Sequence, residues 1–235
     1  MQTHPTLTPN AAMLKMLAGI LISLLLVAAL LFAGAGRLDW DLGWLFVSVW
    51  GLLKILFVFL LRWHDPALLV ERITRHENTQ KYDRWIVPAY FVFAYGTILV
   101  AGLDGGRFRW SGEVPPLLIL AGYAIYLFGN GLASWAVSAN PFFSSESRLQ
   151  TDRDQIVTHS GPYAFVRHPA YSASILIWLV TGWMLESYWA ALPGLLAAVM
   201  MVIRTVYEDR MLRAELPGYL EFAEQVRFRL IPGIW

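Results

Sequence analysis

The sequence predicts an all-α fold, a polytopic transmembrane helical bundle of about six membrane helices. Of its 235 residues, 57% are hydrophobic and 15% are charged, whereas a soluble domain carries about 25% charged residues. Several apolar runs approach the roughly 20 helical residues that cross a hydrocarbon core of about 30 Å. The 11 Trp and 10 Tyr residues suit the aromatic belts at the two membrane interfaces.

Three spans are expected in the first half of the chain. The first, about residues 13–33, has no basic segment before it, which predicts a retained span and not a cleaved signal peptide. The second, about 42–61, is interrupted only by Lys54. The stretch that follows is too polar to span, and Pro66 is expected to begin a short interfacial helix. A third span is expected over about 86–103.

A Gly-rich loop, 104–112, is expected next, followed by a fourth span over 116–139 that contains three glycines. Small residues on a membrane helix let another helix or a ligand approach closely. The apolar run 171–185 is short for a full span, and with the run 188–206 it is expected to form a helical hairpin. The charged remainder predicts two short helices, 208–215 and 219–226, because a Leu-Pro-Gly sequence separates them.

The distribution of basic residues predicts the orientation in the membrane. Six spans place both termini on one side, and outside the spans only Arg37, Arg107 and Arg109 fall on the other side. Cytoplasmic loops carry the excess of Lys and Arg, so both termini and the polar connector between the fourth and fifth spans are expected in the cytoplasm. In a bacterium the membrane would be the inner one. Residues 1–110 are interpreted as an N-terminal set of helices and 111–235 as the functional core.

Several functional classes receive no support from the sequence. The net charge of +1 gives no case for nucleic-acid binding, and the absence of cysteine excludes disulfides, Cys–zinc sites and a Cys nucleophile. The histidines lack metal-ligand spacing such as HExxH, so no metal is expected. No P-loop, GxSxG or GxGxxG motif is present, and the isolated GxG at 129–131 is weak evidence.

The stretch 155–171, QIVTHSGPYAFVRHPAY, concentrates polar, titratable and aromatic groups between two apolar runs. Unsatisfied polar groups in a bilayer cost several kcal/mol each, so such a stretch persists only where it is buried in protein or lines a cavity. We interpret it as the wall of a ligand pocket at the cytoplasmic interface. From spacing alone, His168 could be a general base, a metal ligand, a pocket residue or an interfacial cap.

Two further charged positions lie within or beside apolar runs. Arg204 and Glu208 are four residues apart in RTVYEDR and share one face of a helix. They are read either as an ion pair that anchors a helix end or as functional groups, because ionisable residues in membrane spans are rare. Lys54 is interpreted as structural, with its long stem reaching toward the interface.

Three segments in the second half of the chain carry a known pattern: GPYAFVRHPAY, YEDRML and the closing PGYLEFAEQVRFRLIPGIW. Over roughly residues 129–235 the sequence resembles the isoprenylcysteine carboxyl methyltransferase family and, more broadly, the membrane methyltransferases that include phospholipid N-methyltransferases. Two positions depart from the family pattern. Gln155 stands where the family often has His, and Asp209 replaces the second Glu of a Glu-Glu pair.

The resemblance implies an enzyme that uses S-adenosyl-L-methionine to methylate a lipophilic or lipidated acceptor drawn from the membrane. It implies a substrate-binding role for Arg204 and candidate catalytic roles for Arg204, His168 and Tyr171. A carboxylate acceptor needs no general base, whereas a thiol would need deprotonation with help from His168 or Tyr171. The implied cofactor contacts are Gln155, Ile156, Val157, Thr158, Tyr163, His168, Pro169, Ala170, Tyr171 and Glu208.

Carboxyl O-methylation is the activity that the resemblance favours, and other readings stay open. The same scaffold suits a thiol S-methyltransferase or a lipid N-methyltransferase. Sterol reductases are distantly similar in this region, so an NAD(P)H-dependent membrane reductase is an alternative chemistry. A membrane scaffold without enzymatic activity is the remaining reading.

Overall fold

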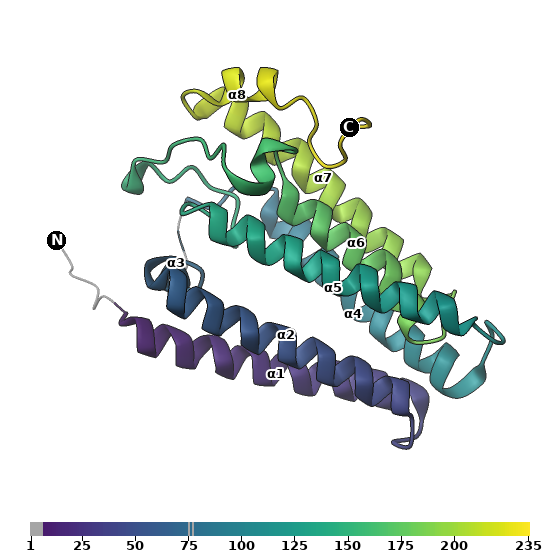
Figure 1. The fold of residues 1–235 in the computed structure, drawn as a ribbon. Coiled ribbons are helices and arrows are strands. Elements are labelled where there is room, and N and C mark those ends of the chain that lie inside the picture. Colours follow the sequence, from purple (N-terminus) through teal and green to yellow (C-terminus); the bar gives the residue numbers. More distant parts are fainter. Residues whose placement is uncertain (1–6, 75, 77) are drawn as a thin grey trace.

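The computed structural model describes residues 7–74, 76 and 78–235, and within these ranges every regular element is helical. Figure 1 shows the arrangement. The α-helices are α1 (Pro9–Ala35), α2 (Asp41–His64), α3 (Pro66–Glu71), α4 (Asp83–Ala101), α5 (Pro116–Ala139), α6 (Pro169–Met184), α7 (Ala191–Glu215) and α8 (Tyr219–Gln225). The shorter elements are a π-helical segment, η1 (Gly102–Phe108), and two 3₁₀ turns, η2 (Thr151–Arg153) and η3 (Gly161–Ala164).

Five helical segments in the described residues are long and apolar enough to cross a membrane: α1, α2, α4 with η1, α5 and α7. The expected sixth span, α6, has 16 residues, which corresponds to about 24 Å of helix against a core of about 30 Å. The expected bundle of about six membrane helices is therefore observed as five full-length helices plus the short α6. Pro169 begins α6, and Glu186, which has a φ of 55°, turns the chain just beyond its end.

Two expected segments continue the helix that precedes them. The Gly-rich segment does not open as a loop at Asp104, because η1 continues α4 through Phe108. Its glycines allow close backbone contact: a Cβ on Gly102 would lie 2.2 Å from the Leu31 carbonyl oxygen, and one on Gly105 would lie 2.0 Å from that of Leu185. The helix expected over 208–215 is the end of α7, which runs unbroken from Ala191 to Glu215.

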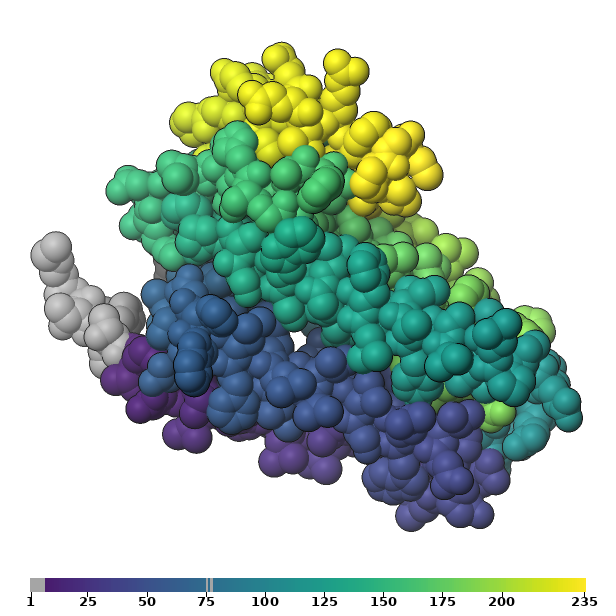
Figure 2. All heavy atoms as spheres, in the orientation of Figure 1, coloured from purple at the N-terminus to yellow at the C-terminus, as the bar shows by residue number. Residues whose placement is uncertain are grey.

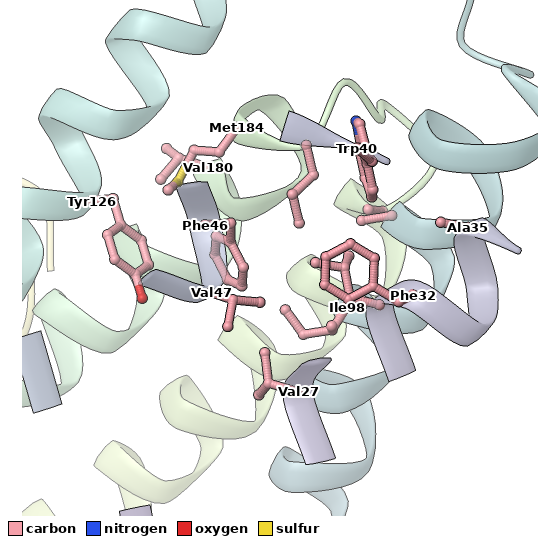
Figure 3. Close-up of a cluster of buried hydrophobic side chains, with 14 residues drawn as sticks. Val27, Phe32, Ala35, Trp40, Phe46, Val47, Ile98, Tyr126, Val180 and Met184 are labelled. Carbon is pink, nitrogen blue, oxygen red and sulfur yellow. The ribbon is translucent and has the colours of Figure 1, made fainter. Parts of the chain in front are cut away.

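The main apolar core lies where α1, α2, α4, α5 and α6 meet. Figure 3 shows its side chains, among them Phe32, Phe46, Ile98 and Met184. All four side chains are buried inside the protein, while many other large apolar side chains on the same helices are exposed on its surface. Because lipid tails are as apolar as these side chains, close packing must hold the helices together.

Glycines let α5 approach α6 closely, as the sequence suggested for this helix. A Cβ on Gly129 would lie 2.9 Å from Ile177, and one on Gly122 would lie 3.0 Å from Met184. Gly131 faces open space instead, because a Cβ added there would have no neighbouring atom within 4 Å. The contact between α5 and α6 therefore depends on two of the three glycines.

The connector 140–168, the end of α7, α8 and the C-terminal segment gather at one end of the bundle, as Figure 1 shows. The C-terminal segment runs beside the start of α6. The backbone N–H groups of Arg167 and His168 donate to the carbonyls of Phe228 (3.0 Å) and Arg229 (2.9 Å). The Ser172 hydroxyl donates to the Leu230 carbonyl at 2.7 Å. These bonds hold the RHPAY stretch in place.

Candidate active site

A polar cavity occupies this end of the bundle. It holds about 760 Å³ of empty space, counting the part open to solvent, and the connector, the start of α6, the end of α7 and α8 form its walls. Of the ten expected cofactor-contact residues, Pro169, the buried first residue of α6, does not line it. The other nine line the cavity: Gln155, Ile156, Val157, Thr158, Tyr163, His168, Ala170, Tyr171 and Glu208.

Glu208 and Tyr171 meet inside the polar cavity, on α7 and α6. The Tyr171 hydroxyl donates to Glu208 Oε2 at 2.5 Å, and the Ser147 hydroxyl donates to the same oxygen at 2.8 Å. The Tyr171 ring stacks on the His168 ring, with centroids 5.6 Å apart and planes 3° apart. Bonds to an ionised group are stronger than neutral ones, so this arrangement holds one carboxylate and one aromatic face at the cavity wall.

Arg204 lies one helical turn before Glu208, and its guanidinium is already paired. Its Nε and Nη2 donate to the two oxygens of Asp83 at 3.0 and 2.7 Å, and Nη2 also donates to the Ser145 carbonyl at 3.0 Å. Its guanidinium carbon lies 5.2 Å from the centre of the Tyr171 ring. Arg204 therefore lies beside the site, one helical turn from Glu208 and close to the Tyr171 ring. Its guanidinium, however, is already bound to Asp83 in a buried ion pair.

Asp209, the second acidic residue of the motif, organises a separate buried cluster. Arg167 binds it through two bonds of 2.7 and 3.1 Å, and Arg229 (2.9 Å) and Arg213 (3.1 Å) also donate to it. The Tyr219 hydroxyl donates to it at 3.1 Å. Asp209 therefore ties α6, α7, α8 and the C-terminal segment together directly behind the polar cavity.

His168 lies between the cavity and this cluster. Its Nε2 is 3.5 Å from Asp209 Oδ1 and 3.4 Å from the Tyr219 hydroxyl oxygen. Burial and then the charge of Asp209 raise the pKa of Tyr219, so its hydroxyl stays protonated at neutral pH. The imidazole is consequently held in a fixed orientation under the Tyr171 ring.

Asn140, at the end of α5, fixes the connector that closes the polar cavity. Its Oδ1 accepts bonds from the Thr158 hydroxyl (3.1 Å) and the Phe142 N–H (2.9 Å), and its Nδ2 donates to the Tyr163 hydroxyl at 3.3 Å. Burial raises the pKa of Tyr163, which keeps that hydroxyl neutral. Gln155 Oε1 accepts from the Gln150 N–H at 2.8 Å, so the residue that replaces His shapes the loop.

The sequence interpretation missed several lining residues of this cavity. Nothing in their local pattern marks them, because they are ordinary loop, apolar or aromatic positions that only the folded chain brings together. They include Asn140, Phe142, Phe143, Ser147, Met211 and Phe222.

A second cavity lies deeper, between α2, α4, α5, α6 and α7. It holds about 1320 Å³, counting the space open to its surroundings, and Lys54, Arg72, Tyr90 and Arg204 are among its walls. Figure 2 shows a small opening between the spheres of α2 and α5. The two cavities share five lining residues, which are Phe143, Ser144, Glu146, Ala170 and Tyr171.

Metal ligands do not cluster in the described ranges, where no group of three or more His, Cys, Asp or Glu side chains could hold an ion. The helices and the two cavities are those of an integral membrane protein with a polar pocket at one end of its bundle, next to a more apolar chamber between its spans.

Comparison with known proteins identifies the family. The family model for phospholipid methyltransferase (PEMT) matches residues 117–216. The cobalt-zinc-cadmium resistance protein CzcN of Cupriavidus metallidurans is 35% identical over 164 residues, which cover 68% of this chain and 68% of that protein. The chain belongs to the phospholipid methyltransferase family, and the resemblance to this group of membrane methyltransferases is confirmed. Membership supports methyltransferase activity in a membrane.

Proposed function

We propose that this protein transfers a methyl group from S-adenosyl-L-methionine to a lipophilic acceptor, and that the accepting group is a carboxylate. The observation that carries the proposal is the wall shared by the two cavities. Tyr171 and Ala170 face a polar pocket on one side and a chamber between the spans on the other. A water-soluble donor and a membrane-borne acceptor can therefore meet at this wall.

The residues of the polar cavity fit the donor. The carboxylate of Glu208 suits an ammonium or ribose hydroxyls, and the faces of Tyr171 and Tyr163 suit a sulfonium through cation–π attraction. When bound, the donor supplies an electrophilic methyl group on a sulfur cation.

The acceptor has a route from the lipid phase. A surface groove between α2 and α5, lined by Leu56, Phe59, Leu60 and Leu127, adjoins the second cavity. The groove and the cavity share four lining residues: Leu53, Phe57, Asn130 and Ser134. An acyl or prenyl chain lying in this groove would place its head group near Tyr171. We place the shared wall on the cytoplasmic side, following the distribution of basic residues.

A carboxylate is the acceptor that best suits the surroundings of His168. A carboxylate is already ionised at neutral pH, so its methylation depends on in-line positioning and needs no proton transfer. A thiol acceptor would need a base, but His168 Nε2 already faces Asp209 and Tyr219. In this proposal His168 supports the Tyr171 ring by stacking on it, and the Arg204 guanidinium lies near the same ring.

Two measurements test the proposed function. Titration calorimetry in detergent should show binding of S-adenosylhomocysteine and none of NADPH. Glu208→Gln should weaken that binding at least tenfold, because a charged hydrogen bond contributes about 1.5–3 kcal/mol, while Glu221→Gln at an exposed position on α8 should not. Binding of NADPH without S-adenosylhomocysteine would favour a reductase instead.

The second measurement identifies the accepting group. Membranes containing the protein are incubated with methyl-tritiated donor, and the labelled lipids are treated with mild base. A methyl ester releases volatile tritiated methanol, whereas S-methyl and N-methyl products keep their label. Base-stable label that depends on the protein would overturn the carboxylate assignment and leave methyl transfer intact.

A further inference from the structure

Three cationic side chains face the second cavity, and they differ in their partners. Arg204 is paired with Asp83. Arg72, directly after α3, has its Nε and Nη1 buried without a hydrogen-bond partner among the residues the structure describes. Lys54, on α2, forms no ion pair or hydrogen bond with any of those residues. In the described chain, neither Lys54 nor Arg72 forms an ion pair with a carboxylate.

Aromatic rings hold Arg72 in position. Its guanidinium carbon lies 5.5 Å from the centre of the Phe57 ring and 5.2 Å from that of Phe143. Phe143 belongs to the wall that both cavities share. Burial lowers the pKa of Arg72 to about 10, which still leaves the side chain charged at neutral pH. Arg72 is thus a fixed cation at the edge of the shared wall.

Lys54 lies deep within its span. It lies ten positions before His64 at the end of α2, which corresponds to about 15 Å of helix. Its Nζ lies 5.9 Å from the centre of the Trp50 ring, one turn earlier. A charge in this part of a membrane is costly and marks a functional site unless it is paired.

The carboxylates near this region have other partners. Glu71 binds Arg148 (2.6 Å) and His76 (2.9 Å). Glu146, which also lines the cavity, accepts a bond of 2.5 Å from the Thr79 hydroxyl. Asp83 is paired with Arg204, so among the described residues that line this cavity Glu146 is the single carboxylate facing Lys54 and Arg72. One carboxylate cannot balance two cations, which leaves room for an anion from outside the chain.

We propose that Lys54 and Arg72 form an anion-binding subsite for the head group of a single-chain anionic amphiphile that enters between α2 and α5. This inference rests on the proposed function and deepens it. In the proposed function the carboxylate acceptor is one such amphiphile, and its head group would be held by these two side chains. Arg204, already paired with Asp83, forms part of the cavity wall. Both residues precede the segment matched by the family model.

The test measures binding of radiolabelled palmitate to the full-length protein in detergent micelles. Unlabelled hexadecyl phosphate, hexadecanol and inorganic phosphate serve as competitors. Palmitate and hexadecyl phosphate should bind about tenfold more tightly than hexadecanol, since a bond to a charged group contributes about 1.5–3 kcal/mol. Inorganic phosphate should not compete, because it has no chain for the groove. Palmitate outcompeting hexadecyl phosphate supports a carboxylate head group. The reverse result supports the anion subsite but contradicts the carboxylate acceptor of the proposed function.

Matched substitutions locate the subsite. Lys54→Met and Arg72→Met should each weaken palmitate binding about tenfold and leave hexadecanol binding unchanged. Lys81→Met and Arg84→Met make the same changes at exposed positions and should alter neither. Equal affinity for palmitate and hexadecanol, or full affinity in both cavity variants, overturns the inference.

Titration of S-adenosylhomocysteine on the same samples separates the two proposals. Normal nucleotide binding with palmitate binding that does not depend on Lys54 and Arg72 refutes the subsite alone. Absent nucleotide binding in the wild-type protein refutes the proposed function, whatever the palmitate result. Normal nucleotide binding in Lys54→Met and Arg72→Met also shows that these variants are folded.

Discussion

Arg204 and Asp83, 121 positions apart in the sequence, are joined by two parallel hydrogen bonds of 3.0 and 2.7 Å. The pair connects α7 to the first residue of α4, and both side chains are buried. Asp83 also accepts a bond of 2.7 Å from the Ser147 N–H, in the connector. One carboxylate thus fixes α4, α7 and the connector beside Glu208.

The Arg204–Asp83 pair should contribute strongly to stability. Asp83→Asn leaves a buried guanidinium without its counter-charge, a change that costs about 3–5 kcal/mol. Thermal unfolding in detergent should show a large loss for this variant, whereas Asp154→Asn at an exposed position should be nearly neutral. Because replacing a whole buried pair is often tolerated, Asp83→Leu with Arg204→Met should be less damaging than Asp83→Asn. The stability loss of the double variant is compared with the losses of Asp83→Leu and Arg204→Met measured alone. A loss equal to their sum would contradict this explanation.

Tyr171→Phe isolates the bond between Tyr171 and Glu208. The ring and its stacking on His168 remain, while the hydroxyl that donates to Glu208 is lost. The carboxylate would be less well oriented, so affinity for S-adenosylhomocysteine should fall by about 1–2 kcal/mol. Calorimetry measures the change, and Tyr188→Phe, at an exposed position, is the matched control. Unchanged affinity together with unchanged turnover would show that the hydroxyl has no role in the site.

Asp209 should hold the C-terminal segment against α6. Asp209→Asn removes the charge that Arg167, Arg213 and Arg229 share, and we expect a loss of about 3–5 kcal/mol. Trypsin should then cut after Arg227 or Arg229 much faster than in the wild-type protein. Glu215→Gln, an exposed change at the end of the same helix, should leave the digestion rate unaltered. Protection equal to the wild type would mean that backbone bonds alone retain the segment.

Gly129 and Gly131 allow a matched test of helix packing. A methyl group at Gly129 would press on Ile177 of α6, so Gly129→Ala should destabilise by about 1–3 kcal/mol. Gly131→Ala meets open space and removes a flexible residue from a helix, so it should stabilise by up to about 1 kcal/mol. Opposite shifts of the thermal midpoint are expected. Equal shifts would show that close approach of α5 and α6 is not what Gly129 provides.

The ion pair between Arg148 and Asp152 predicts a small dependence on pH. The bond from Arg148 lowers the pKa of Asp152 below its ordinary value. Its stabilisation is therefore complete above the unfolded-state pKa of about 3.9 and is lost as the pH falls through the lower, folded-state value. Because Asp152 is half exposed, Asp152→Asn should cost less than about 1 kcal/mol at pH 7. The difference between variant and wild type should shrink below about pH 4 in thermal unfolding.

Apolar runs in the sequence predicted the helices well, because a backbone in lipid must satisfy its own hydrogen bonds within each span. The predicted start of the fourth span at Pro116 and the separate short helices after Pro66 and Gly218 are observed. The helical continuation into η1 was missed, because three glycines read as a loop unless their close contacts are known.

The sequence motifs predicted most of the candidate site: residues of the GPY–RHPxY stretch and Glu208, expected to form one pocket, line one cavity. Spacing could not show that Arg204 is paired, because Asp83 lies in the half of the chain without a motif. From the sequence, Lys54 was interpreted as structural. The fold shows that Lys54 and Arg72 line the same cavity.

The sequence by itself determined the helices, their membrane character and the residues that recur as a family motif, because hydrophobicity and local spacing are properties of neighbouring residues. Only the tertiary structure decided which charges are paired and which face a cavity. Pairing depends on distances between segments far apart in the chain, and those distances exist only once the helices have packed.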